Sequence, residues 1–376
     1  MRNTFIQNPN ALLAGNFKNL EHAMSKYLSD KLTVLYTLLI IMVVHIHSTY
    51  LEMEGKPVAT FLVAVTRDGI AGVANTLFFA ISGFLFARNV LDTRDVFGKM
   101  KKRGRSLVVP YLLWNLIFVG TFIVLENLPG VRGFINGSGT LERFASQPVW
   151  DSVKELFGGP AAFQLWFLRD LIVMILLTPV LWWIAKKSWQ VAAVAALLSS
   201  IIYPWLIAYW GGIIVGTRRW DVEHYPLKWW GVALCAALFA GVGIITSLYE
   251  SDILFKSHPL WRIFRGLVGI AGIYAAWGIY DLLVKGKTLS DKGIWKYICG
   301  YSFFIYCFHE PSLNIFKKLA LKLFGTSEAT LIIFYYLNPL LMVAFAILVA
   351  KCLQRLLPGV YGLLTGGRSR RPGPRN

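Results

Sequence analysis

The stretch LTVLYTLLIIMVVHIHSTY, residues 32–50, decides the class of fold because it is long and apolar enough to cross a lipid bilayer as a helix. About 20 predominantly apolar residues are needed for that crossing. The run carries two histidines near its end, His45 and His47. Ionisable side chains inside a membrane cost free energy, so each of these rings is a candidate for function.

The whole chain of 376 residues shares this apolar character, with 56% apolar and only 15% charged residues. Soluble domains carry roughly 25% charged residues, so the composition excludes a chain that folds with water as its main solvent. The four cysteines occur singly, and they predict neither a disulfide framework nor a metal site. Residues 1–30 are polar and mixed, and no cleaved signal peptide is predicted.

The pattern along the chain predicts an all-α integral membrane protein, a polytopic bundle of about ten transmembrane helices. The expected spans are residues 32–50, 70–87, 106–125, 165–185, 189–203, 205–217, 229–249, 263–284, 297–316 and 331–350. Pro204 should end the fifth helix and begin the sixth, because proline cannot continue a helix. The two could instead form a single kinked span, which would reverse the sides of all later segments.

The distribution of positive charge selects between these two topologies. With ten spans and both termini in the cytoplasm, the inner segments hold 26 of the 38 Lys and Arg residues and the outer segments hold 10. Cytoplasmic loops normally carry such an excess, which accounts for the net charge of +18 without nucleic acid as a partner. We therefore expect a cytoplasmic segment over residues 1–31, a transmembrane domain over 32–350, and a basic, disordered cytoplasmic tail over 351–376 that is drawn to membrane lipids.

The two histidines of the first span should have different surroundings, because residues two apart on a helix point about 200° apart. His47 shares a stripe with Tyr36, which lies eleven residues, or almost three turns, earlier. We therefore expect Tyr36 and His47 to line one wall of a site, while His45 faces elsewhere. An interfacial histidine that reaches toward the outer lipid headgroups is the open alternative for His47.

The segment YSFFIYCFHEP, residues 301–311, puts His309 and Glu310 within the ninth span. Pro311 should kink or break that helix, since proline removes a backbone hydrogen bond. A charged neighbour at this depth favours a functional histidine. The alternative is a histidine that only bonds a carbonyl freed by the kink.

Two stretches carry further polar candidates. Arg169 and Asp170 lie about one turn into the fourth span, where an interhelical ion pair is the alternative to a ligand contact. Ser82 and Gly83 lie in FFAISGFLF, residues 78–86, where small residues favour close helix packing over a ligand contact.

A basic entry precedes the third span. Arg103 and Arg105 belong to KMKKRGRSLVVPYLLWN, residues 99–115, which has five positive charges before the apolar run. Such a cluster could bind the phosphates of a nucleotide cofactor. It could also merely follow the positive-inside rule.

These stretches, in this order, resemble the membrane-bound acyltransferase-3 family of bacterial sugar and glycan O-acetyltransferases. The resemblance rests on VVHIHS (43–48), LFFAISGFLF (77–86), KKRGRSLVVPYLLWN (101–115), LWFLRDL (165–171) and SFFIYCFHEP (302–311). Together they reach over most of the chain.

The resemblance implies transfer of an acyl group, usually acetyl from a cytoplasmic acyl-CoA, to a hydroxyl of a polysaccharide or lipid-linked sugar at the bacterial inner membrane. It makes His47 the catalytic residue. The family often has an arginine eleven residues before that histidine, where this chain has Tyr36. Tyr36 could donate a hydrogen bond there, or another basic residue could take the place of the arginine.

We expect a catalytic group of His47, His309, Glu310 and Tyr36, and a donor-binding group of Arg103, Arg105, Arg169 and Ser82, with acyl-CoA as the donor, no tightly bound cofactor and no metal. A histidine supplies a base near neutral pH for a hydroxyl nucleophile, and Arg or Tyr could stabilise the oxyanion of the attacked thioester. Two other classes stay open. A carrier or flippase for a lipid-linked sugar would suit intramembrane His, Arg and Glu equally well, and a histidine-based envelope sensor is the third.

Overall fold

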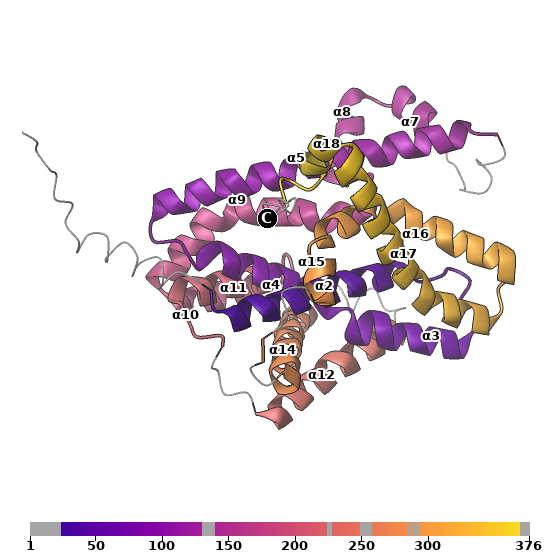
Figure 1. Ribbon diagram of the computed structural model, residues 1–376. Coiled ribbons are helices and arrows are strands. Elements are labelled where there is room, and N and C mark those ends of the chain that lie inside the picture. The colour runs from indigo at the N-terminus through magenta and orange to yellow at the C-terminus, as the bar shows by residue number, and fades with distance from the viewer. Residues whose placement is uncertain are drawn as a thin grey trace, which may run out of the picture.

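The computed structural model describes residues 24–129, 140–223, 228–248, 258–284, 287–288 and 293–368, and every regular element in these ranges is a helix (Figure 1). The longer helices are α2 (Lys26–His47), α4 (Val73–Ala87), α5 (Thr93–Asn127), α9 (Trp166–Lys187), α10 (Trp189–Ser199), α11 (Leu206–Arg218), α12 (Trp229–Leu248), α14 (Pro259–Val284), α16 (Ser302–Phe324) and α17 (Glu328–Leu356). The shorter ones are α3 (Pro57–Val63), the π-helix η1 (Ala64–Ile70), α7 (Thr140–Ser146), α8 (Val149–Val153), η2 (Lys154–Gly158), η3 (Phe163–Leu165), α15 (Ile294–Cys299) and α18 (Pro358–Leu364).

Seven helical segments are long and apolar enough to cross a membrane. They are Lys26–His47, Pro57–Ala87, Thr93–Asn127, Phe163–Lys187, Trp229–Leu248, Pro259–Val284 and Glu328–Leu356. The three other predicted spans correspond to the short helices α10 and α11 and to α16, which is interrupted at Glu310. The predicted separation at Pro204 is confirmed, because α10 ends at Ser199 and α11 begins at Leu206. The all-helical character is confirmed for the described residues, whereas ten spans and cytoplasmic termini stay predictions.

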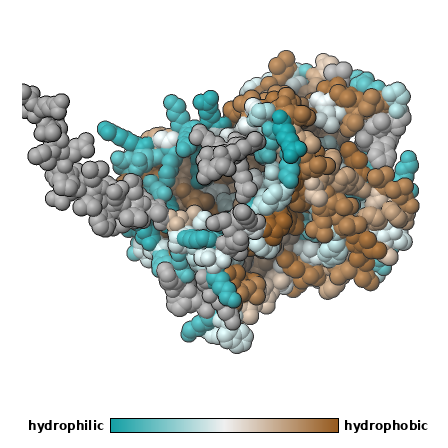
Figure 2. Space-filling model, viewed as in Figure 1, coloured by the Kyte–Doolittle hydropathy of each residue, from teal (hydrophilic) through white to brown (hydrophobic). Residues whose placement is uncertain are grey.

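The outward faces of the helices are apolar. Leu234, Leu238 and Ile245 are exposed on α12, and Leu176 and Val180 are exposed on α9. Figure 2 shows hydrophobic side chains spread over much of one face, whereas hydrophilic side chains gather toward the left, where α9 ends and α5 begins in Figure 1. Exposed apolar surface of this extent fits contact with lipid rather than with water.

Glycines let α4 and α11 pack with their backbones in contact. A Cβ atom on Gly212 would lie 2.0 Å from the carbonyl oxygen of Ala80, and a Cβ atom on Gly83 would lie 2.1 Å from that of Tyr209. Any side chain at either position would therefore collide with the opposite backbone. Small residues at helix crossings allow such close approach in membranes, which confirms the packing predicted for Gly83.

The chain stays helical past residue 350, so the predicted disorder of the tail is wrong for residues 351–368. Helix α17 continues to Leu356, and α18 follows almost directly. The basic composition indicated disorder, but Tyr361 and Leu364 are buried and anchor α18 on the bundle. Residues 1–23 and 369–376 lie outside the described residues, and the predictions for those parts are untested.

Gly212→Ala should destabilise the protein, because its methyl group would collide with the Ala80 carbonyl and push α4 away from α11. Overpacking of this kind costs about 1–3 kcal/mol. The matched control is Gly211→Ala, because a Cβ atom on Gly211 meets nothing within 4 Å and alanine has the higher helix propensity. Thermal unfolding of the purified protein in detergent checks both variants. An equal loss of stability in the two would contradict the packing account.

Candidate active site

His47 and His309 meet where α2 ends. His47 is the last residue of α2, and His309 lies on α16 just before that helix breaks. Their ring centroids are 5.1 Å apart, and the His47 ring lies 5.4 Å from the ring of Phe163. Lys317 donates from Nζ to the backbone oxygen of His47 at 3.2 Å, as suits a cation near the carbonyl end of a helix. The structure thus brings two of the predicted catalytic residues together.

The His309 ring is held with its proton on one particular nitrogen. Its Nδ1 atom lies 2.7 Å from the backbone oxygen of Tyr306. A carbonyl oxygen can only accept, so Nδ1 carries the proton and Nε2 of the neutral ring keeps a lone pair. His309 is fully buried, and within the described part of the chain its Nε2 has no hydrogen-bond partner. The ring therefore bonds a backbone carbonyl, as the alternative interpretation held, and still offers an acceptor beside His47.

Helix α16 is broken at Glu310, as Pro311 predicted. The residue before a proline is pushed out of helical geometry, and Glu310 has φ −111° and ψ 138°. The buried Gln164 side chain donates from Nε2 to the backbone oxygens of Cys307 at 3.3 Å and Glu310 at 3.1 Å. The Glu310 carboxylate accepts a hydrogen bond from Asn314 at 2.8 Å. These bonds satisfy the backbone oxygens of Cys307 and Glu310 at the break.

A cavity of about 500 Å³ runs alongside α2, and three predicted residues line it. These are Tyr36, Ser82 and Arg103. Ile40 and Val43 continue the α2 wall toward the histidine pair. Tyr36 thus lies on the cavity wall, whereas His47, predicted to share that wall, is not among the lining residues. We call this space the central cavity.

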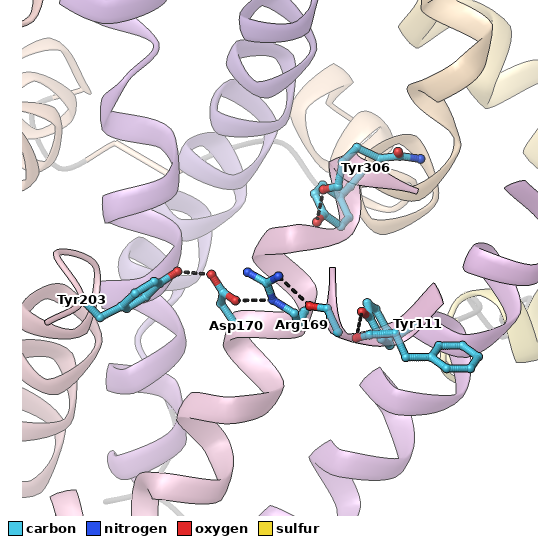
Figure 3. Close-up of polar contacts among 8 residues, drawn as sticks. Tyr111, Arg169, Asp170, Tyr203 and Tyr306 are labelled. Carbon is cyan, nitrogen blue, oxygen red and sulfur yellow. Dashed lines mark hydrogen bonds and ion pairs between the residues drawn. The ribbon is translucent and has the colours of Figure 1, made fainter. Parts of the chain in front are cut away.

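Tyr306 connects the central cavity to the histidine pair. Its side chain lines the cavity, and its backbone oxygen accepts the bond from His309. Its hydroxyl donates to the backbone oxygen of Gln164 at 2.7 Å, a contact drawn in Figure 3. The His47 ring is not part of the cavity lining and lies beyond it, against Phe163 and His309.

Arg368 supplies a second guanidinium to the central cavity. The chain turns after α18 at Gly366, whose φ is 62°. A Cβ atom there would lie 2.1 Å from the carbonyl oxygen of Ser106, so the turn requires glycine. The Arg368 guanidinium lies 4.1 Å from the ring centroid of Phe303, and Nη1 donates to the Ser106 oxygen at 3.1 Å. Arg368 and Arg103 thus line the same space as Tyr36.

Arg105 does not line the central cavity. It lies with Lys101 and Lys102 in a separate groove of about 730 Å³ between α5 and α18. Arg103 and Arg105 were predicted to act together, but two helical positions about 200° apart cannot face one cavity. The structure separates them accordingly.

Arg169 forms an ion pair with its own neighbour. Its Nε atom donates to Asp170 at 2.7 Å, and its Nη1 atom donates to the backbone oxygen of Gly158 at 2.8 Å (Figure 3). Asp170 also accepts a hydrogen bond from Tyr203, which lies between α10 and α11. Arg169 is not part of the central cavity lining. These contacts link α9 to Gly158 and Tyr203. The arrangement is therefore closer to the alternative prediction, an ion pair that fixes packing, than to a ligand contact.

His45 faces away from the histidine pair, as predicted. Its Nδ1 atom bonds the backbone oxygen of Ile41 at 3.0 Å. Its ring lies 6.1 Å and 6.2 Å from the rings of Tyr335 and Tyr336 on α17. The two rings of the first span therefore have different surroundings, and only His47 meets His309.

Sequence reasoning assigned no role to three residues of this site: Gln164, Tyr306 and Arg368. Tyr306 precedes His309 by three residues, which is one helical turn, and that spacing could have indicated it. The Gly-Gly pair before Arg368 could have indicated a turn. Nothing in the sequence singles out Gln164, because its partners are backbone oxygens of a distant helix.

A known protein family matches most of the chain, including most residues of this site. Residues 31–351 match the family described as "Acyltransferase domain". The "Succinoglycan biosynthesis protein ExoH" of Rhizobium meliloti (strain 1021) is 28% identical over 305 residues, which are 77% of this chain and 78% of that protein. No solved structure matches the chain. The family match includes His47, His309 and Arg103 and ends before Arg368.

His47→Ala should lower the rate of the reaction by on the order of 100-fold or more if the ring acts as a general base. His45→Ala should lose far less, because its ring contacts α17 and not His309. The measurement is acyl transfer by the two purified variants from labelled acetyl-CoA, the donor that the sequence resemblance implies. Equal losses, or a larger loss in His45→Ala, would show that the wrong ring has been assigned.

Proposed function

The chain belongs to the family of acyltransferase domains, and from that premise we propose that it transfers an acyl group from a cytoplasmic acyl-CoA to a hydroxyl of a polysaccharide or lipid-linked saccharide. We take acetyl as the acyl group and the bacterial cytoplasmic membrane as the location. The involvement of a relative in succinoglycan biosynthesis supports a polysaccharide as the acceptor.

The observation that carries this proposal is a chain of contacts that leads from the central cavity to the histidine pair. Arg103 and Arg368 lie in the central cavity with Tyr36. Tyr306 lines the same cavity and bonds His309, and His309 contacts His47. A polyanionic donor with a long, narrow arm fits this arrangement, with its phosphates at the arginines and its thioester near the histidines.

Guanidinium groups suit the donor end because they bind phosphate with two parallel hydrogen bonds. Neither Arg103 nor Arg368 is paired with a carboxylate among the described residues. Both positive charges are therefore available to a ligand. Arg368 is our candidate for the basic residue that compensates for Tyr36 in place of arginine.

The histidine pair suits proton transfer. The neutral His309 ring has its lone pair on Nε2 and can accept an N–H bond from His47, whose ring centroid is 5.1 Å away. That bond would leave the other His47 nitrogen as the base. His47 takes the proton of the acceptor hydroxyl while the oxygen attacks the thioester carbon. The C–S bond then breaks, and the proton passes to the leaving thiolate.

Tyr36 acts on the donor arm rather than on the reacting carbonyl in this proposal. Eleven residues of helix separate it from His47, which is about 16 Å at 1.5 Å per residue. The thioester carbonyl therefore cannot contact both Tyr36 and His47. Glu310, bonded to Asn314, is a positioning residue at the break of α16. A carrier or flippase, the alternative function, is not favoured by membership of an acyltransferase family.

Arg103→Lys and Arg368→Lys should raise the apparent KM for the donor, because lysine keeps the charge but loses the two-pronged geometry. One charge-assisted bond is worth about 1.5–3 kcal/mol, so the increase should be roughly ten- to hundredfold. Arg105→Lys is the matched control, since Arg105 lies in the separate groove. The assay varies labelled acetyl-CoA and acceptor separately with the purified protein.

The acceptor KM should stay nearly unchanged in all three variants. An unaltered donor KM in both Arg103→Lys and Arg368→Lys would remove the central cavity as the donor site. A loss confined to Arg105→Lys would move the donor to the groove between α5 and α18. Wild-type protein that leaves acetyl-CoA unconsumed would contradict acetyl transfer itself.

A further inference from the structure

A second cavity, of about 860 Å³, opens beside the end of α2. Its walls come from η1, α12, α14 and the turn between α10 and α11. Ile46, the residue before His47, lines this cavity. Asn75 lines both this cavity and the central one. The two spaces therefore adjoin at Asn75, and we call the second one the outer cavity.

Close packing beside a π-helix forms one wall of the outer cavity. A Cβ atom on Gly243 of α12 would lie 2.3 Å from the backbone oxygen of Asp68. Only glycine lets α12 come this close to η1. The π-helical turn changes the direction of side chains within a helix, and such turns occur frequently at functional sites. Here η1 presents Arg67 and Asp68 to the cavity.

The outer cavity has more positive than negative charge. Arg67 is neutralised by Asp68, with 2.8 Å between Nε and Oδ2. Arg262 donates to the backbone oxygen of Ile201 at 2.8 Å, and Arg265 donates to the hydroxyl of Thr246 at 3.3 Å. Both of these guanidinium groups thus bond neutral oxygens only, in the part of the chain that the structure describes. Among the described lining residues, Asp68 is the single carboxylate beside three arginines, and it also attracts Arg265. The lining therefore keeps a net positive charge, which favours an oxyanion as the ligand.

Aromatic side chains provide the rest of the binding surface. Trp205, Trp261 and Phe239 line the outer cavity together with the arginines. Flat rings of this size offer the apolar faces of sugar rings a large contact area at low conformational cost. Arginine combined with tryptophan is therefore a surface for a saccharide that also carries negative charge.

We propose that the outer cavity binds an acidic saccharide, one that carries a carboxylate or phosphate group, as the acceptor of the transfer. This inference rests on the proposed function, in which a hydroxyl of the acceptor is the nucleophile. Arg262 and Arg265 bind the oxyanion, and Trp205 and Trp261 pack against the sugar rings. A hydroxyl of the bound saccharide then faces the junction at Asn75, where the two cavities meet.

The test measures binding to the full-length protein in nanodiscs, without donor. The probes are hexagalacturonate, which carries sugar carboxylates, geranylgeranyl diphosphate, which carries the diphosphate of a lipid-linked saccharide, and carboxyl-reduced hexagalacturonate, which is neutral and of the same length. We expect at least one anionic probe to bind tenfold or more tightly than the neutral one. Its affinity should also fall as salt is added. The anionic probe that binds identifies the source of the oxyanion.

Arg265→Gln should lower the affinity for the anionic probe that binds the wild type about ten- to hundredfold. This variant is suited to the test because, among the described residues, the Arg265 side chain makes a single hydrogen bond, to the hydroxyl of Thr246. Arg265→Lys should recover part of the affinity, and Arg262→Gln is a second variant. Arg355→Gln is the control, because Arg355 is exposed near the far end of α17. Its affinity should equal that of the wild type.

Equal binding of the neutral and anionic probes, or binding of none, would overturn the proposal. Unchanged affinity in both Arg265→Gln and Arg262→Gln would do the same. Consumption of labelled acetyl-CoA by the same preparations is measured in parallel. Donor turnover without anionic binding would overturn the acceptor site alone, whereas absence of turnover would count against the proposed function.

Discussion

The hydrogen bond from Nδ1 of His309 to the backbone oxygen of Tyr306, 2.7 Å long, is the contact on which the account of the site depends. It fixes the proton of a neutral ring on one nitrogen and leaves the other nitrogen as an acceptor toward His47. In a low-dielectric interior such a bond is strong, and an unsatisfied polar atom beside it is costly. The bond holds its geometry because α16 breaks one residue later, where Gln164 satisfies the carbonyls around Pro311.

The same constraint explains how charge is distributed over the bundle. Ionisable groups in an apolar layer must be paired, hydrogen-bonded or turned into a cavity. Lys31, for example, is fully buried and paired with Asp281 at 2.7 Å. Arg169 is paired with Asp170. The guanidinium groups that are not paired with carboxylates in the described chain include Arg103 and Arg368 in the central cavity, and Arg262 and Arg265 in the outer one. Arginines without a carboxylate partner thus occur in the two cavities, where a ligand could neutralise them.

Much of the fold follows from the sequence because lipid makes the helical signal strong. Each of the ten predicted ranges overlaps a helix, and Pro204 and Pro311 interrupt the helices near where they were expected to. Helical geometry alone also separated His45 from His47, and it put Tyr36 on the wall of the central cavity. The same geometry argued against Arg103 and Arg105 facing one cavity, although the prediction treated them as one cluster.

The rest depends on contacts between residues far apart in the chain, which a single sequence does not reveal. Arg368 reaches the cavity through a glycine turn at Gly366 and a contact with Phe303, so its basic segment was misread as disordered. The outer cavity was not foreseen because its residues come from six separate segments of the chain. No local pattern marks a space that forms only when Gly243 lets α12 approach η1.

The most direct test of the central claim is a structure of the full-length protein with an acetyl-CoA analogue in which a ketone replaces the thioester. The account predicts that the phosphates of the analogue lie against Arg103 and Arg368, and that its carbonyl lies within hydrogen-bonding reach of the groups around His47. An analogue bound in the groove of Arg105, or one whose carbonyl stops at Tyr36, would contradict it.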